Sequence, residues 1–439
     1  MSEDMVMVKT NLLRNDETII SSISVTDIFF DVYLGKWNYR AIPKMKTWSY
    51  FLTIPKYIKC VIMNTRVSII HCSDYSNAKD AIKESLNLIG GLEKIISPGN
   101  RVLLKPNVLA IRPPEDAVTT HPAVVAAMCE LVSEAGGIPI IGDGSGIVKP
   151  GSTTTSQAFK ASGIEDVASS CGVGLINFET YGYVEVDVPG ATQFSRIHIS
   201  RAVLEVDVII SLPKLKIHEL TLYTGAVKNF FGTIPQKNRK QAHFLEDRNR
   251  FGEAVVDIYS IVKPHLAAMD GVVGMEGNGP ANGTPIFTGV IMASYDCVAL
   301  DIVASELIGI DPLKVPTNKA ALSRGFGTEH PEIVGIPLEE VKIRFKRPEG
   351  GITAMMPSFL MRILRRQLTV KPFINISSCA LCKACVSNCS AHAIEEVGRS
   401  LKINEEKCIE CYCCRELCPK DAVEIKKSLL LKLITRSKS

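Results

Sequence analysis

The chain lacks the features that mark several common protein classes. Aromatic residues make up only 6% of its 439 residues, and no basic stripe is interleaved with aromatics, which disfavours a nucleic-acid-binding protein. No run approaches the roughly 18–20 uncharged apolar residues that cross a membrane, because Lys56 and Lys59 interrupt the apolar segment Trp48–Met63. Nothing resembles a secretory signal. We therefore expect a soluble, cytoplasmic protein that has no membrane span and binds no nucleic acid.

Composition and charge add little that is unusual. The apolar content of 46% and the charged content of 22% are those of an ordinary globular protein, and the length indicates at least two domains. The net charge of +4 is unevenly distributed. From Gly351 onward the chain has 15 Lys and Arg against 8 Asp and Glu, a formal +7 that leaves −3 on the rest. Thiolates bound to a metal centre would offset much of this positive charge.

Cysteine is the residue that stands out. Nine of the 14 cysteines lie between Cys379 and Cys418, and eight of them spell C-x2-C-x2-C-x3-C twice. This is the ligand pattern of bacterial two-cluster ferredoxins, in which the fourth cysteine of each run reaches the other cluster. We therefore predict two 4Fe–4S clusters. The ligands are Cys379, Cys382, Cys385 and Cys418 for the first cluster, and Cys408, Cys411, Cys414 and Cys389 for the second.

Zinc and disulfides are the alternatives to clusters. A zinc ribbon uses two CxxC pairs rather than two triplets that are each followed by a fourth cysteine, and disulfides require an oxidising compartment. Ser390 stands where the first run would have a proline, as Pro419 follows the second, and Cys413 is an extra thiol that the spacing leaves out. The segment Cys385–Glu396 aligns with Cys413–Ile425, which indicates an internal duplication.

Between Arg66 and Phe345, short apolar runs alternate with helical patterns. The expected strands are Val67–Cys72, Arg101–Lys105, Ile138–Gly142, Val206–Leu212, Leu266–Asp270 and Phe287–Ala293. The expected helices are Ala78–Leu88, Pro122–Ala135, Glu219–Phe230, Phe251–Val262 and Cys297–Ile308. Strands rich in Val, Ile and Leu that alternate with helices predict an α/β domain, a mostly parallel sheet with helices on both faces. The cysteine-rich tail predicts a small α+β ferredoxin-like domain.

The remaining segments have weaker patterns. Residues 1–62 have no sustained period and a cleaner pattern begins at Met63, so that either translation starts there or residues 1–62 are a poorly ordered or partner-binding extension. We expect the α/β domain over 63–348, and after it a linker with a short basic amphipathic helix over 349–375, the ferredoxin domain over 376–427 and a basic tail over 428–439.

Polar runs follow several of the expected strands, where ligands of open α/β folds bind. They are Lys105-Pro106-Asn107 with Thr119-Thr120-His121, Gly142–Gly146, Lys214–His218 with Lys228-Asn229, and Asp270-Gly271 with Gly277–Gly283. We interpret His121, Asp296 and Asp301 as helix caps. The loop Gly142–Gly146 could cradle a phosphate through its backbone amides, whereas Gly277–Gly283 lacks the spacing of a dinucleotide fingerprint.

The segment from Lys214 to Lys228 is the strongest candidate site. On an extended segment, Lys214, Lys216 and His218 project to one face, and Lys228 would lie near the far end of the expected helix, where its charge favours the dipole. Concentrated Lys and His suit an anionic substrate, and a neutral histidine could ligate a metal or transfer a proton. We therefore predict that these four residues form the catalytic site, with a solvated basic edge as the alternative.

These stretches resemble the domain-of-unknown-function 362 family. The matching segments occur in order between Arg66 and Gly327. They are LLKPNVL, TTHPAVV, IIGDGSG, SLPKLKIHELTLYTGAVKNFFGTIP, AMDGVVGMEGNGPANGTP and SYDCVALD. Members of the family often carry a bacterial-type ferredoxin module at the C-terminal end, as here. The resemblance implies an α/β domain in a redox context, without an established reaction or substrate.

Together these patterns favour an iron–sulfur oxidoreductase component. A soluble electron donor or acceptor protein would exchange single electrons with the clusters, and the α/β domain would bind and reduce a small anionic substrate. Cluster potentials span roughly −700 to +450 mV, so the direction of electron flow stays open. The alternative is a non-catalytic electron-transfer protein, or one that handles a cofactor or metal.

Overall fold

The computed structural model describes residues 65–146, 154–348 and 370–427, except 244, 246, 390, 406 and 409–411. The chain divides into two units, 1–63 and 64–439, and all described residues belong to the second. They form an α/β domain and a cysteine-rich module. The expected N-terminal extension, the amphipathic helix of the linker and the basic tail lie outside the described residues.

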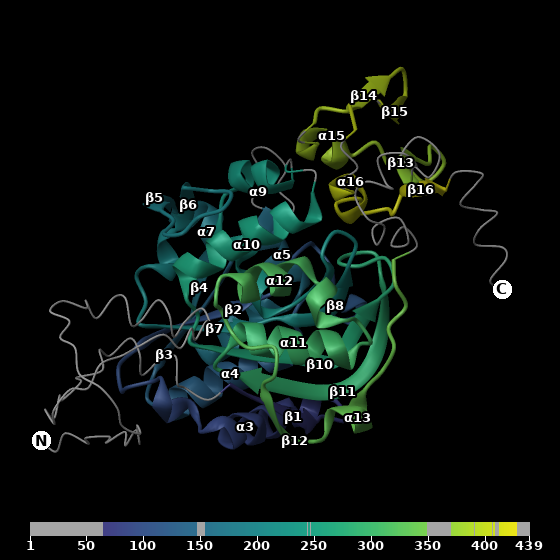
Figure 1. Cartoon of the computed structure of the whole chain (residues 1–439). Coiled ribbons are helices and arrows are strands. Elements are labelled where there is room, and N and C mark those ends of the chain that lie inside the picture. The colour runs from purple at the N-terminus through teal and green to yellow at the C-terminus, as the bar shows by residue number, and fades with distance from the viewer. Residues whose placement is uncertain are drawn as a thin grey trace, which may run out of the picture. The chain divides into compact units, whose positions relative to one another are not determined.

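A ten-stranded sheet forms the centre of the α/β domain (Figure 1). Its strands run in the order β12-β1-β11-β10-β7-β2-β3-β4, with β8 paired to β10 and to β9. They are β1 (Arg66–His71), β2 (Arg101–Pro106), β3 (Ile138–Asp143), β4 (Gly174–Asn177), β7 (Val208–Leu212), β8 (Lys214–His218), β9 (Leu222–Thr224), β10 (Leu266–Glu276), β11 (Thr284–Ser294) and β12 (Glu332–Gly335). Antiparallel pairs join β11 to β1 and β10, and β9 to β8, whereas the other pairs are parallel. The expected mostly parallel α/β fold is confirmed.

Helices cover both faces of this sheet (Figure 1). Helices α3 (Ala78–Ile89), α4 (Pro122–Glu134), α5 (Thr154–Ala161) and α6 (Ile164–Cys171) pack on one face. Helices α8 (Ala226–Asn229), α10 (Arg248–Val262), α11 (Cys297–Leu307), α12 (Pro316–Ser323) and α13 (Leu338–Val341) pack on the other. The shorter elements are α7 (Phe178–Tyr181), α9 (Gln236–His243) and the hairpin of β5 (Tyr183–Asp187) and β6 (Arg196–Ser200).

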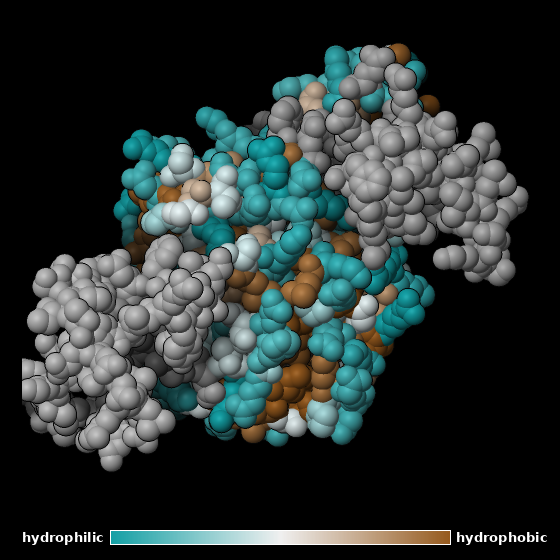
Figure 2. All heavy atoms as spheres, in the orientation of Figure 1, coloured by the Kyte–Doolittle hydropathy of each residue, from teal (hydrophilic) through white to brown (hydrophobic). Residues whose placement is uncertain are grey.

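Side chains alternate between the two faces of each central strand, so that a hydrophobic core forms on each face of the sheet. In β10, Leu266 and Ala268 point into the first core, whereas Ala267 and Met269 point into the second, as the two-residue period of a strand requires. Each fully buried Leu or Met contributes about 1.5–3 kcal/mol relative to an exposed one. The described surface in the view of Figure 2 is mostly hydrophilic, with hydrophobic residues in small groups between the polar ones.

Three expected elements differ from the structure. The helix expected over Glu219–Phe230 is instead a turn, the short strand β9 and the four-residue helix α8. Leu222 has a positive φ of 65° at the turn of the β8–β9 hairpin, which a helix cannot contain. Strands β10 and β11 are also longer than expected, because β10 continues through Gly271 with a register shift there, and glycines at bulges do not end a strand.

The cysteine-rich module consists of two related halves. Strand β13 (Val370–Ile374) pairs with β16 (Val423–Lys427), and β14 (Ile394–Val397) pairs with β15 (Ser400–Ile403). The short helices are α15 (Ala384–Asn388) and α16 (Cys413–Glu416). Because β13 belongs to the module, residues 370–375 of the expected linker are part of this domain.

Candidate functional site

A cavity of about 100 Å³ opens at the carboxyl ends of the central strands, where ligands of open α/β folds bind. Loops after β2 and β3, the β8–β9 hairpin and helices α8 and α9 surround it. The lining residues are Lys105, Asn107, Val108, Leu109, Asp143, Gly144, Gly146, Lys216, Thr224, Lys228, Asn229, Phe231, Gly232, Gln236, Arg239, Lys240, His243, Pro280, Asn388 and Leu417. We refer to this cavity as the basic pocket.

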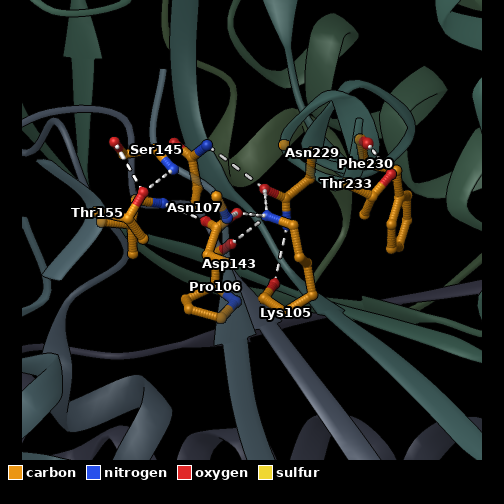
Figure 3. A network of polar contacts seen from close by, with 12 residues as sticks. Lys105, Pro106, Asn107, Asp143, Ser145, Thr155, Asn229, Phe230 and Thr233 are labelled. Carbon is orange, nitrogen blue, oxygen red and sulfur yellow. Dashed lines mark hydrogen bonds and ion pairs between the residues drawn. The ribbon is translucent and has the colours of Figure 1, made fainter. Parts of the chain in front are cut away.

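A buried polar network joins Lys105, Asp143 and Asn229 at the edge of the basic pocket (Figure 3). Lys105 Nζ lies 2.5 Å from Asp143 Oδ1, and Asn229 Nδ2 donates to the Lys105 carbonyl oxygen at 2.9 Å. Asp143 also accepts the backbone N–H groups of Val108 at 2.8 Å and Gly144 at 2.7 Å. Burial lowers the pKa of Lys105 and raises the pKa of Asp143, while the ion pair opposes both shifts. The network ties the ends of β2 and β3 to helix α8.

Two glycines allow the backbone to approach this network. A Cβ on Gly232 would lie 2.6 Å from Asp143 Oδ1, and a Cβ on Gly144 would lie 2.7 Å from the Gly232 carbonyl oxygen. Both distances are shorter than a Cβ tolerates. Glycine is therefore required at both positions by close packing around the Lys105–Asp143 pair.

Basic side chains dominate the lining. Lys216, which is 1% exposed, donates to the Val118 carbonyl oxygen at 2.6 Å. Lys228 Nζ lies 5.5 Å from the ring centroid of Phe231, within the range of a cation–π contact. With Lys105, Arg239 and Lys240, five Lys and Arg side chains line the pocket, and Asp143 is the single carboxylate among the described lining residues. The electrostatic balance favours a bound anion.

The guanidinium of Arg239 is fixed by the backbone rather than by a carboxylate. It donates to the carbonyl oxygens of Ile234 at 2.8 Å, Gly232 at 2.8 Å and Ser145. Its position is therefore set by the loops that form the pocket, and its charge remains part of the pocket's field.

His243 lies beside these cations. Its ring packs edge-on against Phe231 at 5.6 Å between centroids. Burial, together with Lys228 and Arg239, lowers the pKa of His243 to about 3. The imidazole is therefore neutral at physiological pH, and Nδ1 has no hydrogen-bond partner among the described residues. It can hydrogen-bond a ligand without adding charge.

Asp301 of α11 positions the helix that carries Lys228. Its carboxylate accepts the N–H groups of Ala226 at 2.6 Å and Val227 at 3.0 Å, and the hydroxyl of Tyr223 at 2.9 Å. It therefore caps α8, not the start of its own helix, whereas Asp296 does cap α11 as expected. Burial raises the pKa of Asp301 to about 7.

The four residues of the expected catalytic cluster lie on β8 and α8, but only Lys216 and Lys228 line the pocket. Lys214 lies in a separate buried cluster, where it donates to Asp270 and to the Tyr75 hydroxyl, both at 2.8 Å. His218 Nδ1 accepts the N–H groups of Leu220 and Thr221 at the hairpin turn, and burial lowers its pKa well below the usual value. Lys214, Lys216 and His218 thus come from one strand but lie in three places. Lys214 is in the cluster with Asp270, Lys216 is in the basic pocket, and His218 is at the hairpin turn.

The other polar runs have structural roles around the pocket. His121 caps α4 through Nδ1, as expected. In the loop Gly142–Gly146, the amides of Gly144, Ser145 and Gly146 already donate to Asp143, Thr155 and Leu109. That loop lines the pocket without offering free amides for a phosphate.

Helix α9 supplies lining residues that sequence reasoning missed. Arg239, Lys240 and His243 all come from its short polar sequence QKNRKQAH. This run has no apolar periodicity that would predict a helix. Its high local density of basic residues is the one feature of the sequence that could have indicated these lining residues.

Four cysteines line a second cavity, within the module. They are Cys379, Cys382, Cys385 and Cys418, three from the first run and the last from the second. This is the set expected for the first cluster, and none of the four is joined in a disulfide. In the second set, Cys411 lies outside the described residues. No three described His, Cys, Asp or Glu side chains are grouped to hold a single metal ion.

The duplication extends to backbone conformation and to hydrogen bonds to sulfur. Lys383 and His392 in the first half have positive φ values of 56° and 48°, as Tyr412 and Asp421 have at the same spacing in the second, with 59° and 47°. The N–H of Ala393 donates to Cys389 Sγ at 3.2 Å, and the N–H of Ala422 donates to Cys418 Sγ at 3.1 Å. Both fourth cysteines are thus held in the same way, by hydrogen bonds of a kind that tune iron–sulfur centres.

The module also forms part of the basic pocket. Asn388 and Leu417 are among the lining residues, and each directly precedes the fourth cysteine of its run. A buried ion pair of 3.0 Å joins Arg415 to Glu219 of the α/β domain.

No described helix is long and apolar enough to cross a membrane.

Comparisons with known proteins find a family that matches the α/β domain and a similarity to a ferredoxin. A family model described as "Domain of unknown function (DUF362)" matches residues 102–306. The "Thylakoid-associated protein sll1697" of Synechocystis sp. is 33% identical over 290 residues, which are 64% of this chain and 88% of that protein. A "Ferredoxin" of Saccharopolyspora erythraea is 40% identical over 41 residues, 9% of this chain and 39% of that protein.

Among solved structures, the lactate racemase apoprotein of Thermoanaerobacterium thermosaccharolyticum has a TM-score of 0.36 and 11% identity. The match covers 56% of this chain and 57% of the racemase.

Proposed function

The chain belongs to the DUF362 family, and from that premise we propose that it is an iron–sulfur redox protein that binds a small anion beside two 4Fe–4S clusters. The observation that carries the proposal is that residues next to cluster cysteines form part of a pocket lined by five cations. The clusters, when bound, would supply single electrons that come from a soluble donor protein. The pocket would hold the anionic substrate that receives them.

The arrangement of cysteines supports clusters over zinc. We assign Cys379, Cys382, Cys385 and Cys418 to the first cluster, and Cys408, Cys411, Cys414 and Cys389 to the second. The first four line one cavity. Two triplets that are each followed by a fourth cysteine are the ligand pattern of two-cluster ferredoxins, whereas a zinc ribbon uses two CxxC pairs. The similarity to a ferredoxin points the same way.

The charge of the pocket supports a small anion as substrate. Lys216 and Lys228 would bind its negative group, because a unit charge about 4 Å away contributes about 4 kcal/mol at an effective dielectric constant of about 20. A cavity of about 100 Å³ is smaller than one of about 150 Å³ that holds benzene. Inorganic phosphate or a carboxylate of a few carbons therefore matches the site.

Two neutral groups would orient that anion. The side-chain oxygen of Asn107 and Nδ1 of His243 have no hydrogen-bond partner among the described residues. A ligand hydroxyl could donate to Asn107, and His243 could donate or accept according to its tautomer. Phe231 and Leu417 present apolar surface that limits water around the charge.

The cluster half of the proposal is tested by anaerobic purification of the full chain. We expect about eight iron and eight acid-labile sulfide per chain and EPR signals after reduction with dithionite. The presence of zinc, or of neither metal nor sulfide, would refute it.

The anion half is tested by calorimetric titration of the same protein with inorganic phosphate. Lys216→Ala should weaken binding at least tenfold while the EPR signals persist. Lys319→Ala, which changes an exposed lysine of α12, is the matched control and should leave the affinity unchanged. Equal affinity in wild type and Lys216→Ala would remove the pocket from the proposal.

A further inference from the structure

The basic pocket and the cysteine module have a common boundary. Asn388 and Leu417 are both less than a tenth exposed and line the pocket. Asn388 precedes Cys389, and Leu417 precedes Cys418. Because consecutive Cα atoms lie about 3.8 Å apart, the backbone of each of these two lining residues directly adjoins that of a proposed cluster ligand.

Direct contacts hold this boundary in place. Lys240, which also lines the pocket, donates to the carbonyl oxygen of Ser387 at 2.9 Å. Asn282 donates to the carbonyl oxygen of Arg415 at 2.7 Å, and the side chain of Arg415 pairs with Glu219 at 3.0 Å. Arg415 and Glu219 are 7% and 5% exposed on their side chains, so water screens this boundary poorly.

On the module side, every one of these contacts falls beside a cluster ligand. Ser387 lies two residues before Cys389, and Arg415 follows Cys414. Charge in the pocket is therefore close to the cysteines that bind the clusters, across a boundary fixed by hydrogen bonds and a buried ion pair.

We propose that an anion in the basic pocket lowers the reduction potential of the adjacent clusters, so that the protein becomes a stronger electron donor when its substrate is bound. The inference rests on the proposed function and adds regulation of the same site. Reduction of a cluster adds one negative charge, and the bound anion repels it. By reciprocity, reduction weakens anion binding by the same factor.

The expected size follows from charge and distance. Two unit charges about 10 Å apart at an effective dielectric constant of about 20 interact strongly enough to change an equilibrium about tenfold. A tenfold change in affinity corresponds to about 59 mV for one electron. Electrons would therefore remain on the clusters until the pocket is filled, which limits their loss to other acceptors.

The test is an EPR-monitored redox titration of the anaerobically purified full chain, with and without saturating inorganic phosphate. Chloride keeps the ionic strength constant, because salt alone changes surface electrostatics. We expect phosphate to lower the midpoint potential by about 59 mV. Calorimetry on the oxidised and the dithionite-reduced protein should give affinities that differ about tenfold.

Variants assign the effect to the pocket. The shift should disappear in Lys228→Ala and in Lys216→Ala, so that the test stands if one of the two fails to fold. Lys402→Ala, which removes an exposed charge from β15 of the module, is the control and should retain the shift. A shift that persists in both pocket variants would overturn the inference.

The outcomes separate the two proposals. Phosphate binding and cluster signals with an unmoved or raised midpoint would overturn the linkage and leave the proposed function intact. Absence of cluster signals or of phosphate binding would overturn both.

Discussion

Asp143→Asn should change stability and anion binding in opposite directions. In the folded chain Asp143 pairs with Lys105 at 2.5 Å and accepts two backbone N–H groups. Removal of one partner of a buried ion pair costs about 3–5 kcal/mol, and the amide retains one oxygen to accept one of the two N–H groups. We therefore expect the free energy of unfolding to fall by about 3 kcal/mol. Phosphate affinity should rise about tenfold, because the single carboxylate among the described lining residues is lost.

The assay is urea unfolding under anaerobic conditions without phosphate, since phosphate at 100 times its dissociation constant would itself add about 2.7 kcal/mol. Calorimetry gives the affinity of the same preparation. The double variant Lys105→Met with Asp143→Asn removes the unpaired cation and should recover part of the lost stability. Unchanged stability in Asp143→Asn would mean that the carboxylate does not stabilise Lys105, and weaker phosphate binding would mean that it does not repel the anion.

Three further predictions test the site. Gly232→Ala should lower the free energy of unfolding by more than about 2 kcal/mol, because its Cβ would lie 2.6 Å from Asp143 Oδ1. The control Gly174→Ala, whose Cβ would have its nearest neighbour at 3.6 Å, should lower it by less than about 1 kcal/mol in the same urea assay. Sulfate affinity, measured by calorimetry, should be constant from pH 5.5 to 7.5, because the pKa of His243 is about 3; binding that strengthens towards pH 5.5 would indicate a histidine with an ordinary pKa. Asp301→Ala leaves two N–H groups of α8 unpaired and should lower the free energy of unfolding by about 3 kcal/mol. The pKa of Asp301 is about 7 when folded and about 4 when unfolded, so wild-type stability should fall as pH rises between these values, and this fall should be smaller in the variant.

Much of the fold could be predicted from the sequence because strands and helices of the α/β domain have clear periods. The expected helix at Ala78 and the strand at Arg101 agree with α3 and β2 to within about one residue. The hairpin at Leu222 could not be predicted from period alone, since its apolar spacing also fits a helix and the strand pairing with β8 is a tertiary contact.

The candidate site could be predicted in part. Lys216 and Lys228 are recognisable because basic residues follow a buried strand, and both line the pocket. Lys214 shares a face of β8 with Lys216, but its partner Asp270 lies 56 residues further on, so the sequence could not reveal that it is already paired. Arg239 and Asn388 escape prediction because they reach the pocket only through the arrangement of α9 and the module.

The proposals depend above all on an anion pocket that adjoins the clusters, and 31P ENDOR on the reduced protein with bound phosphate would detect that proximity. We predict a phosphorus coupling to the reduced cluster in the wild type that is absent in Lys216→Ala. Phosphate that binds in the calorimeter, with no phosphorus coupling to a cluster that gives a clear EPR signal, would show that the anion and the clusters are not neighbours.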